Sequence, residues 1–183
     1  MTLKTIPGIF LILMLFSFGI AGDEEGPRFN EKDTSAIIKA SYIYNFAKLI
    51  DWPEKEKKGN FIIGVMGGSS MYQQLVTKYN GKKIGSQAIE IRKISNTQNF
   101  SICHVLFVDH DHNGVLEEVI PQVKGHSTLL ITHREGGLEL GAAINFVVVE
   151  DNLKFELSVS NAENHNLFVG STLKSLALFV ENQ

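Results

Sequence analysis

One long apolar stretch, residues 37–53, constrains the fold of this chain more than any other part of its sequence. Apolar residues recur there at steps of three and four, which places them on one wide face of a helix. A narrow polar stripe is left for Lys39, Ser41, Asn45 and Lys48. Asp33-Thr34-Ser35 offers oxygens to cap the first turn, and Pro53 ends the helix because it lacks a backbone donor. A helix this apolar is expected to lie in a core.

The aromatic residues of this stretch allow a second role. Tyr42, Tyr44 and Trp52 carry large amphipathic rings, and such rings anchor many protein interfaces because they bury much area while fixing few torsions. Two interpretations therefore stand: a core helix, or a helix whose aromatic end also contacts a partner. For Trp52 we favour the core, because it directly precedes a turn that must dock the first strand.

Short apolar runs alternate with amphipathic segments along the rest of the chain. Strands are expected at residues 61–66, 88–94, 102–108 and 128–132, and a hairpin at residues 143–149 and 153–159. Helices are expected at residues 71–79 (capped by Ser69 or Ser70), 115–123 and 165–180. This order predicts an α/β three-layer sandwich: a mixed, mostly parallel sheet flanked by helices, with a C-terminal antiparallel hairpin and a closing helix.

The first 21 residues are expected to be a signal peptide rather than part of the fold. Lys4 precedes an apolar run, and Gly19-Ile20-Ala21 places small residues where a signal peptidase acts. Cleavage near Ala21 leaves residues 22–34 as a flexible leader and residues 35–183 as a single domain, with no membrane span after processing. An uncleaved anchor is the alternative, although the run is short for a membrane span.

Charge and cysteine content exclude several classes of protein. The formal net charge is −3 and no basic run occurs, so no nucleic-acid partner is expected. Cys103 is the only cysteine, which rules out an internal disulfide; we expect it to be a buried, unreactive thiol. No CxxC, HExxH or dinucleotide motif is present, so the chain is not expected to be an enzyme.

Two turns are the candidate ligand sites. Gly67, Gly68, Ser69 and Ser70 link an expected strand to a helix, the place where α/β sheets bind ligands and free N–H groups attract anions. Asp109 to Gly114 matches the first half of a calcium loop, but Ile120 stands where a glutamate ligand belongs. His110 and His112 would need further ligands to bind a transition metal. Plain turns are favoured at both places, so no metal and no cofactor is expected.

Six segments, in order, carry a resemblance to a known family. They are KASYIYNFAK (39–48) followed by Trp52-Pro53, IGVMG (63–67), CHVLFV (103–108), GAAINF (141–146), KFEL (154–157) and STLKSLA (171–177). The first is fairly specific, and the others are persuasive only together. Across nearly all of the chain beyond the expected leader, the sequence resembles the YfiR-like family.

The resemblance implies an exported bacterial α/β protein without enzymatic activity. The family's namesake restrains a membrane-bound diguanylate cyclase from the periplasmic side, which lowers cyclic-di-GMP output and biofilm formation. The resemblance thus implies a periplasmic regulator whose partner is a membrane signalling protein, a diguanylate cyclase or a sensor kinase. Some relatives use paired cysteines for redox control, which Cys103 alone cannot provide internally.

Two rival interpretations stay open. One is a periplasmic small-ligand-binding protein that uses the turn at Gly67 to Ser70. The other is a small metal-dependent enzyme that uses Asp109 to His112. The oligomeric state is not fixed by the sequence, and a homodimer is compatible with it.

Overall fold

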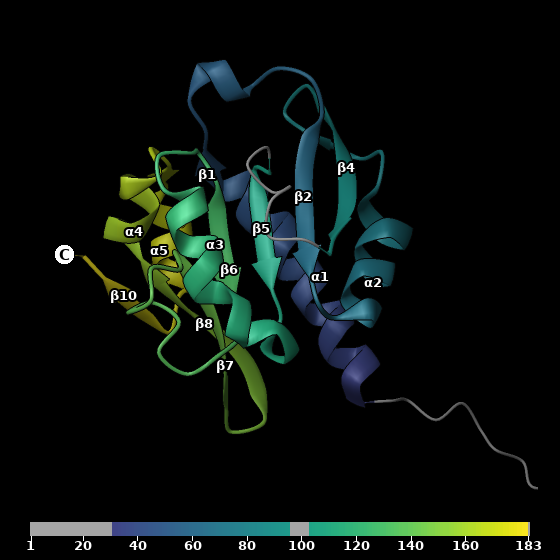
Figure 1. Ribbon diagram of the computed structural model, residues 1–183, viewed down its shortest axis with the longest axis vertical. Helices are drawn as coiled ribbons and strands as arrows, with labels where there is room; N and C mark the ends of the chain where they lie inside the picture. Colours follow the sequence, from purple (N-terminus) through teal and green to yellow (C-terminus); the bar gives the residue numbers. More distant parts are fainter. Residues whose placement is uncertain (1–30, 96–102, 183) are drawn as a thin grey trace, which may run out of the picture.

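A mixed eight-stranded sheet with helices on both faces forms the body of the molecule, a computed structural model that describes residues 31–95 and 103–182 (Figure 1). The order of its strands is β10-β8-β7-β6-β5-β2-β4-β3. Their bounds are β2 Phe61–Met66, β3 Lys83–Ile84, β4 Gln87–Ile94, β5 Val105–Val108, β6 Leu129–Thr132, β7 Ile144–Val149, β8 Asn152–Ser158 and β10 Phe179–Glu181. The expected three-layer α/β class is confirmed.

The centre of the sheet is parallel and its end is antiparallel. Strands β4, β2, β5, β6 and β7 run parallel to one another, and β7 and β8 form the expected hairpin, with Phe146 opposite Phe155. Glu150 and Asp151 both adopt positive φ angles at its tip, as a tight two-residue hairpin turn requires. A separate antiparallel pair joins β1 (Ile50–Asp51) to β9 (Phe168–Val169).

The helices divide between the two faces of the sheet. They are α1 Glu31–Leu49, α2 Ser69–Tyr79, α3 Leu116–Val123, α4 Val159–Asn164 and α5 Ser171–Leu176, with short 3-10 turns at Glu54–Glu56 and His110–Val115. On one face, α1 and α2 share a core with the sheet, in which Phe46 and Ile63 are almost fully buried. On the other face, α3 packs against the sheet through residues such as Leu116 and Leu130. In Figure 1, α3 lies in front of the sheet and α1 behind it.

Two expected helix starts differ from the structure. Helix α1 begins at Glu31, so Asp33-Thr34-Ser35 lies inside it and does not cap it. Helix α2 begins at Ser69, after Gly68 in a left-handed conformation, and no side chain caps it. In both places the hydroxyl-rich segment was interpreted as a cap, although Ser and Thr also fit within a first turn.

The expected closing helix over residues 165–180 is wrong. That segment forms β9, the short helix α5 and the strand β10. Asn166 adopts a positive φ angle, which ends any helix before it. Leu178 then donates its backbone N–H to the carbonyl of Phe155, which leads the chain into a parallel edge strand beside β8. Backbone pairing with β8 at the edge of the sheet therefore determined the structure of this segment, although the spacing of its apolar residues is helical.

Residues 1–30 and 96–102 lie outside the part that the structure describes, so the expected signal peptide, most of the leader and the start of the expected strand 102–108 are not placed. Among the described residues, none of the helices combines the length and apolar character needed to cross a bilayer.

Candidate functional site

The carboxyl ends of β2 and β5 form the point where the chain changes direction across the sheet. These two strands are neighbours, but the chain leaves β2 through α2 to reach β4 and leaves β5 through α3 to reach β6, on the opposite side and face. In open α/β sheets a crevice forms at such a switch point, and ligands bind there. Both turns singled out in the sequence, Gly67 to Ser70 and Asp109 to Gly114, begin at this point.

A buried lysine on α1 reaches into this switch point. Lys39 is only 5% exposed, although the sequence placed it on the polar stripe of the helix. Its Nζ atom lies 2.9 Å from Nδ1 of His133 and 3.4 Å from Oδ1 of Asp109. Burial lowers the pKa of Lys39, while the nearby charge of Asp109 opposes that shift. Lys39 is therefore a buried member of a polar cluster, which its place on the polar stripe did not predict.

Asp109 is the central acceptor of the cluster. Its carboxylate is buried, which by itself would raise its pKa. The adjacent His133 ring, the charge of Lys39 and hydrogen bonds from His110 outweigh burial and hold the pKa of Asp109 well below its usual range. Both the backbone N–H and the ring Nδ1 of His110 donate to Oδ1 of Asp109, at 2.9 Å and 3.0 Å. Asp109 is therefore ionised at neutral pH.

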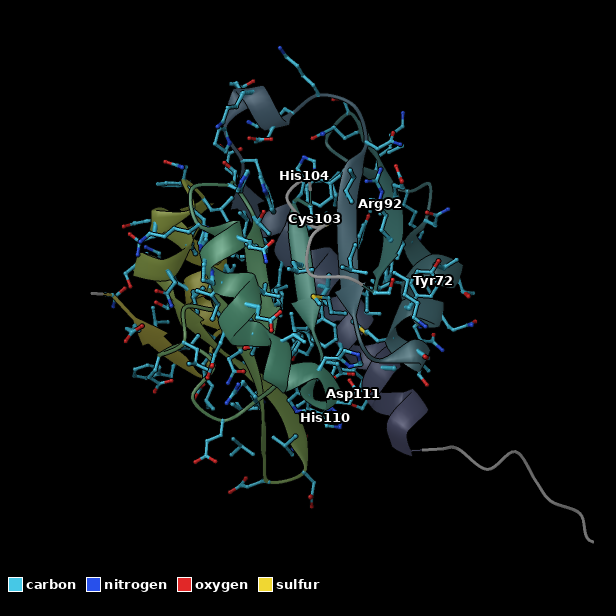
Figure 2. All side chains as sticks on the ribbon, viewed as in Figure 1. Tyr72, Arg92, Cys103, His104, His110 and Asp111 are labelled. Carbon is cyan, nitrogen blue, oxygen red and sulfur yellow. The ribbon has the colours of Figure 1, made fainter. Side chains whose placement is uncertain are left out.

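His112 repeats this pairing one step further along the loop. Its Nδ1 donates to Oδ1 of Asp111 at 3.0 Å, and that bond is the main reason why the pKa of Asp111 is lowered. Figure 2 shows His110 and Asp111 close together beyond the end of β5. Asp109, His110 and His133 form a further set: one potential ligand atom of each lies within 4.8 Å of the others. The structure thus gathers imidazoles and carboxylates at one place.

The glycine turn after β2 packs directly against this loop. Gly67 and Gly68 both have positive φ angles, and a Cβ atom on Gly67 would meet Asp111 and His112 while one on Gly68 would meet Asp109. The carboxylate of Asp111 also accepts a hydrogen bond from the backbone of Gly68. The amino end of α2 therefore already faces two carboxylates of the protein, which disfavours an external anion at this turn.

The three aromatic residues of the first helix segment lie in different environments. Trp52 is 5% exposed, donates its indole Nε1–H to the carbonyl of Ser127 at 2.9 Å and meets the Phe61 ring edge-on. Tyr42 is half-buried among phenylalanines, and Tyr44 stacks on Tyr79 at a centroid distance of 4.6 Å. Trp52 is thus a core residue, as we favoured, and partner contact by Tyr42 and Tyr44 stays a prediction.

Cys103 lies at the other end of β5 and is buried, as expected. Its Sγ would contact a Cβ atom placed on Gly64, so the two strands pack closely there. Burial raises the pKa of the Cys103 thiol to about 11. The thiolate that reacts with oxidants and metals is therefore scarce at neutral pH.

Sequence reasoning missed two members of the cluster, Lys39 and His133. Lys39 was hidden by its place in a helix pattern, where a buried charge cannot be told from a solvated one. His133 carried a usable signal, because it directly follows β6, next to β5 in the sheet. Residues that follow neighbouring parallel strands meet at the same edge, as Asp109 and His133 do.

Comparison with known proteins gives one family match. The sequence model of the family described as YfiR/HmsC-like matches residues 36–178. No curated protein matches the chain.

Proposed function

This chain belongs to the YfiR/HmsC-like family of regulators, and from that premise we propose that it is a periplasmic, non-enzymatic protein that restrains a membrane diguanylate cyclase. It would bind the outer face of the cyclase and lower its output of cyclic-di-GMP. The family match carries this proposal, because it spans residues 36–178 and so covers the fold from α1 to α5. A sensor kinase is the other membrane partner that fits the same role.

The surface between α1 and α5 supports a docking role. A groove of about 190 Å³ lies there, lined by residues that include Tyr42, Asn45 and Leu176. The segment after α4 also exposes large apolar side chains, with exposed fractions of 69% for Phe168, 62% for Leu176, 51% for Leu178 and 54% for Phe179. Exposed apolar side chains next to half-buried tyrosines are typical of protein-binding surfaces. We propose that Tyr42 and Leu176 contact the partner.

A charge placed on this surface tests the proposal. Leu176→Glu is expected to weaken binding of a detergent-solubilised cyclase at least tenfold and to raise cellular cyclic-di-GMP, because a buried unpaired carboxylate disrupts an interface. Val148→Glu is the matched control, since Val148 is 60% exposed but lies near the tip of the β7–β8 hairpin. Equal binding by the two variants would contradict this docking surface.

Capture from membranes tests the function itself. The immobilised mature protein is expected to retain a protein with a diguanylate cyclase domain from solubilised membranes. Deletion of the gene for this chain should raise cyclic-di-GMP in the cell. If deletion leaves cyclic-di-GMP unchanged and only a transport protein is retained, the regulatory role is wrong. Such a result would favour the alternative, a small-ligand-binding protein that uses Gly67, Gly68, Ser69 and Ser70.

Export is part of the proposal. The small residues before Gly22 predict a mature amino terminus there, within a residue or two. Amino-terminal sequencing of protein recovered from the periplasm measures this directly. Recovery of the chain with Met1 still present would show that the segment is kept as an anchor.

A further inference from the structure

We propose that Asp109, His110 and His133 form a binding site for one divalent transition-metal ion at the switch point. The sequence alone offered His110 and His112 without further ligands. The fold brings His133 from the end of the neighbouring strand β6 to His110, and it buries the carboxylate of Asp109 beside both imidazoles. This inference does not depend on the proposed regulatory function.

The distances suit a small ion. Oδ1 of Asp109 lies 3.0 Å from Nδ1 of His110 and 3.7 Å from Nδ1 of His133. Two bonds of about 2.1 Å at a tetrahedral angle span roughly 3.4 Å between their ligand atoms. The two imidazole rings stand at 74° to each other with centroids 5.6 Å apart, so both lie beside the carboxylate of Asp109. Metal binding through Nδ1 of His110 replaces the proton that this atom donates to Asp109, and that proton is released to solvent.

The cluster already holds a cation, which is the ammonium group of Lys39. That group touches two of the three ligand atoms, Nδ1 of His133 and Oδ1 of Asp109. A metal ion would take the position of the ammonium, and the flexible stem of Lys39 lets that group withdraw. Lys39 is thus an internal competitor of the metal.

The surrounding charges favour a metal over an anion. Asp109 and Asp111 face the amino end of α2, where an anionic ligand would have to bind. Two imidazoles with one carboxylate are ligands that Zn²⁺, Ni²⁺, Co²⁺ and Cu²⁺ accept, whereas Ca²⁺ and Mg²⁺ require more oxygen atoms. The proposed ligand class is therefore a transition metal of intermediate softness, and calcium is not expected to bind.

Titration of the tag-free mature protein with Co²⁺ and Zn²⁺ tests the site. Co²⁺ is expected to bind one per chain and to develop the visible absorption of a nitrogen-coordinated ion, and Zn²⁺ is expected to raise the melting temperature. His110→Ala, which truncates an exposed side chain, should weaken Co²⁺ binding by about tenfold or more. His133→Ala should do the same. His126→Ala is the matched control and should leave binding unchanged. His126 is exposed and lies near the amino end of β6, whereas the proposed site lies at the carboxyl ends of the strands.

Lys39→Gln provides the second arm. Removal of the competing ammonium is expected to tighten Co²⁺ binding relative to the natural chain, with folding checked by circular dichroism. Binding that His110→Ala and His126→Ala weaken equally would overturn the proposal, and so would no binding by the natural chain at micromolar Co²⁺. A rise in melting temperature with inorganic phosphate, lost in His110→Ala and absent with Zn²⁺, would also overturn it in favour of an anion site.

Discussion

Trp52→Ala is expected to lower the free energy of unfolding by about 3–5 kcal/mol. Truncation leaves a cavity beside Phe61 and leaves the carbonyl of Ser127 without its indole donor. Activity in every assay should then fall together, because the folded population falls. Denaturant unfolding of the mature protein measures the change.

Trp52→Phe separates the two contributions. It keeps an aromatic ring against Phe61 but removes the Nε1–H group, so we expect a smaller loss than for Trp52→Ala, on the scale of one buried hydrogen bond plus a partial cavity. Partner binding by the folded fraction should be unchanged in both variants. Unchanged stability with lost binding would show instead that Trp52 anchors the partner.

Asp109→Ala is expected to cost about 3–5 kcal/mol at neutral pH, because it removes the one carboxylate that forms an ion pair with the buried ammonium of Lys39 among the described residues. Asp111→Ala is the control. Its carboxylate is exposed and bonds to an exposed histidine, so its loss should cost far less. Similar losses in the two variants would mean that the Lys39–Asp109 pair contributes little to stability. Thermal and denaturant unfolding measure both changes.

The ionisation of Asp109 also sets how the stability of the protein changes in acid. The folded pKa of Asp109 lies below its unfolded value, so its contribution to stability is complete above the unfolded pKa, near 4, and is lost as the pH falls towards the folded value. The stability difference between the natural chain and Asp109→Asn should therefore shrink as the pH drops below about 4. A difference that grows in acid would contradict the assigned ionisation.

The sequence predicted the centre of this fold well and its margins poorly. Strand β2, the β7–β8 hairpin and the end of α2 lie where the apolar patterns placed them. All six residues of β2 are buried, and a buried strand leaves a continuous apolar run. The carboxyl-terminal segment was misread because apolar spacing alone does not show that an open sheet edge is available. β10 forms only because Phe155 and its neighbours offer that edge.

The candidate site shows a similar limit. The two turns were each found, and each alone was best explained as a plain loop. Only the order of the strands brings the two turns together. That order cannot be derived from one sequence, because the chain after β4 could place β5 on either side of β2. Lys39 was beyond reach for a different reason. Helical periodicity shows on which face of a helix a residue lies. A lysine at the boundary between the apolar face and the polar stripe is assigned to the polar stripe because of its charge.

The pairing of β1 with β9 has a consequence for how the chain acquires its structure. Ile50, just after the long first helix, pairs with Val169, about 120 residues further along the chain. Contacts of such sequence separation form late, because a large loop must close before they stabilise anything. The segment that follows the first helix therefore lacks its pairing partner until nearly the whole polypeptide has been synthesised. A chain that crosses a membrane amino terminus first would therefore stay incompletely folded during transport. It would complete its fold only after β9 has crossed.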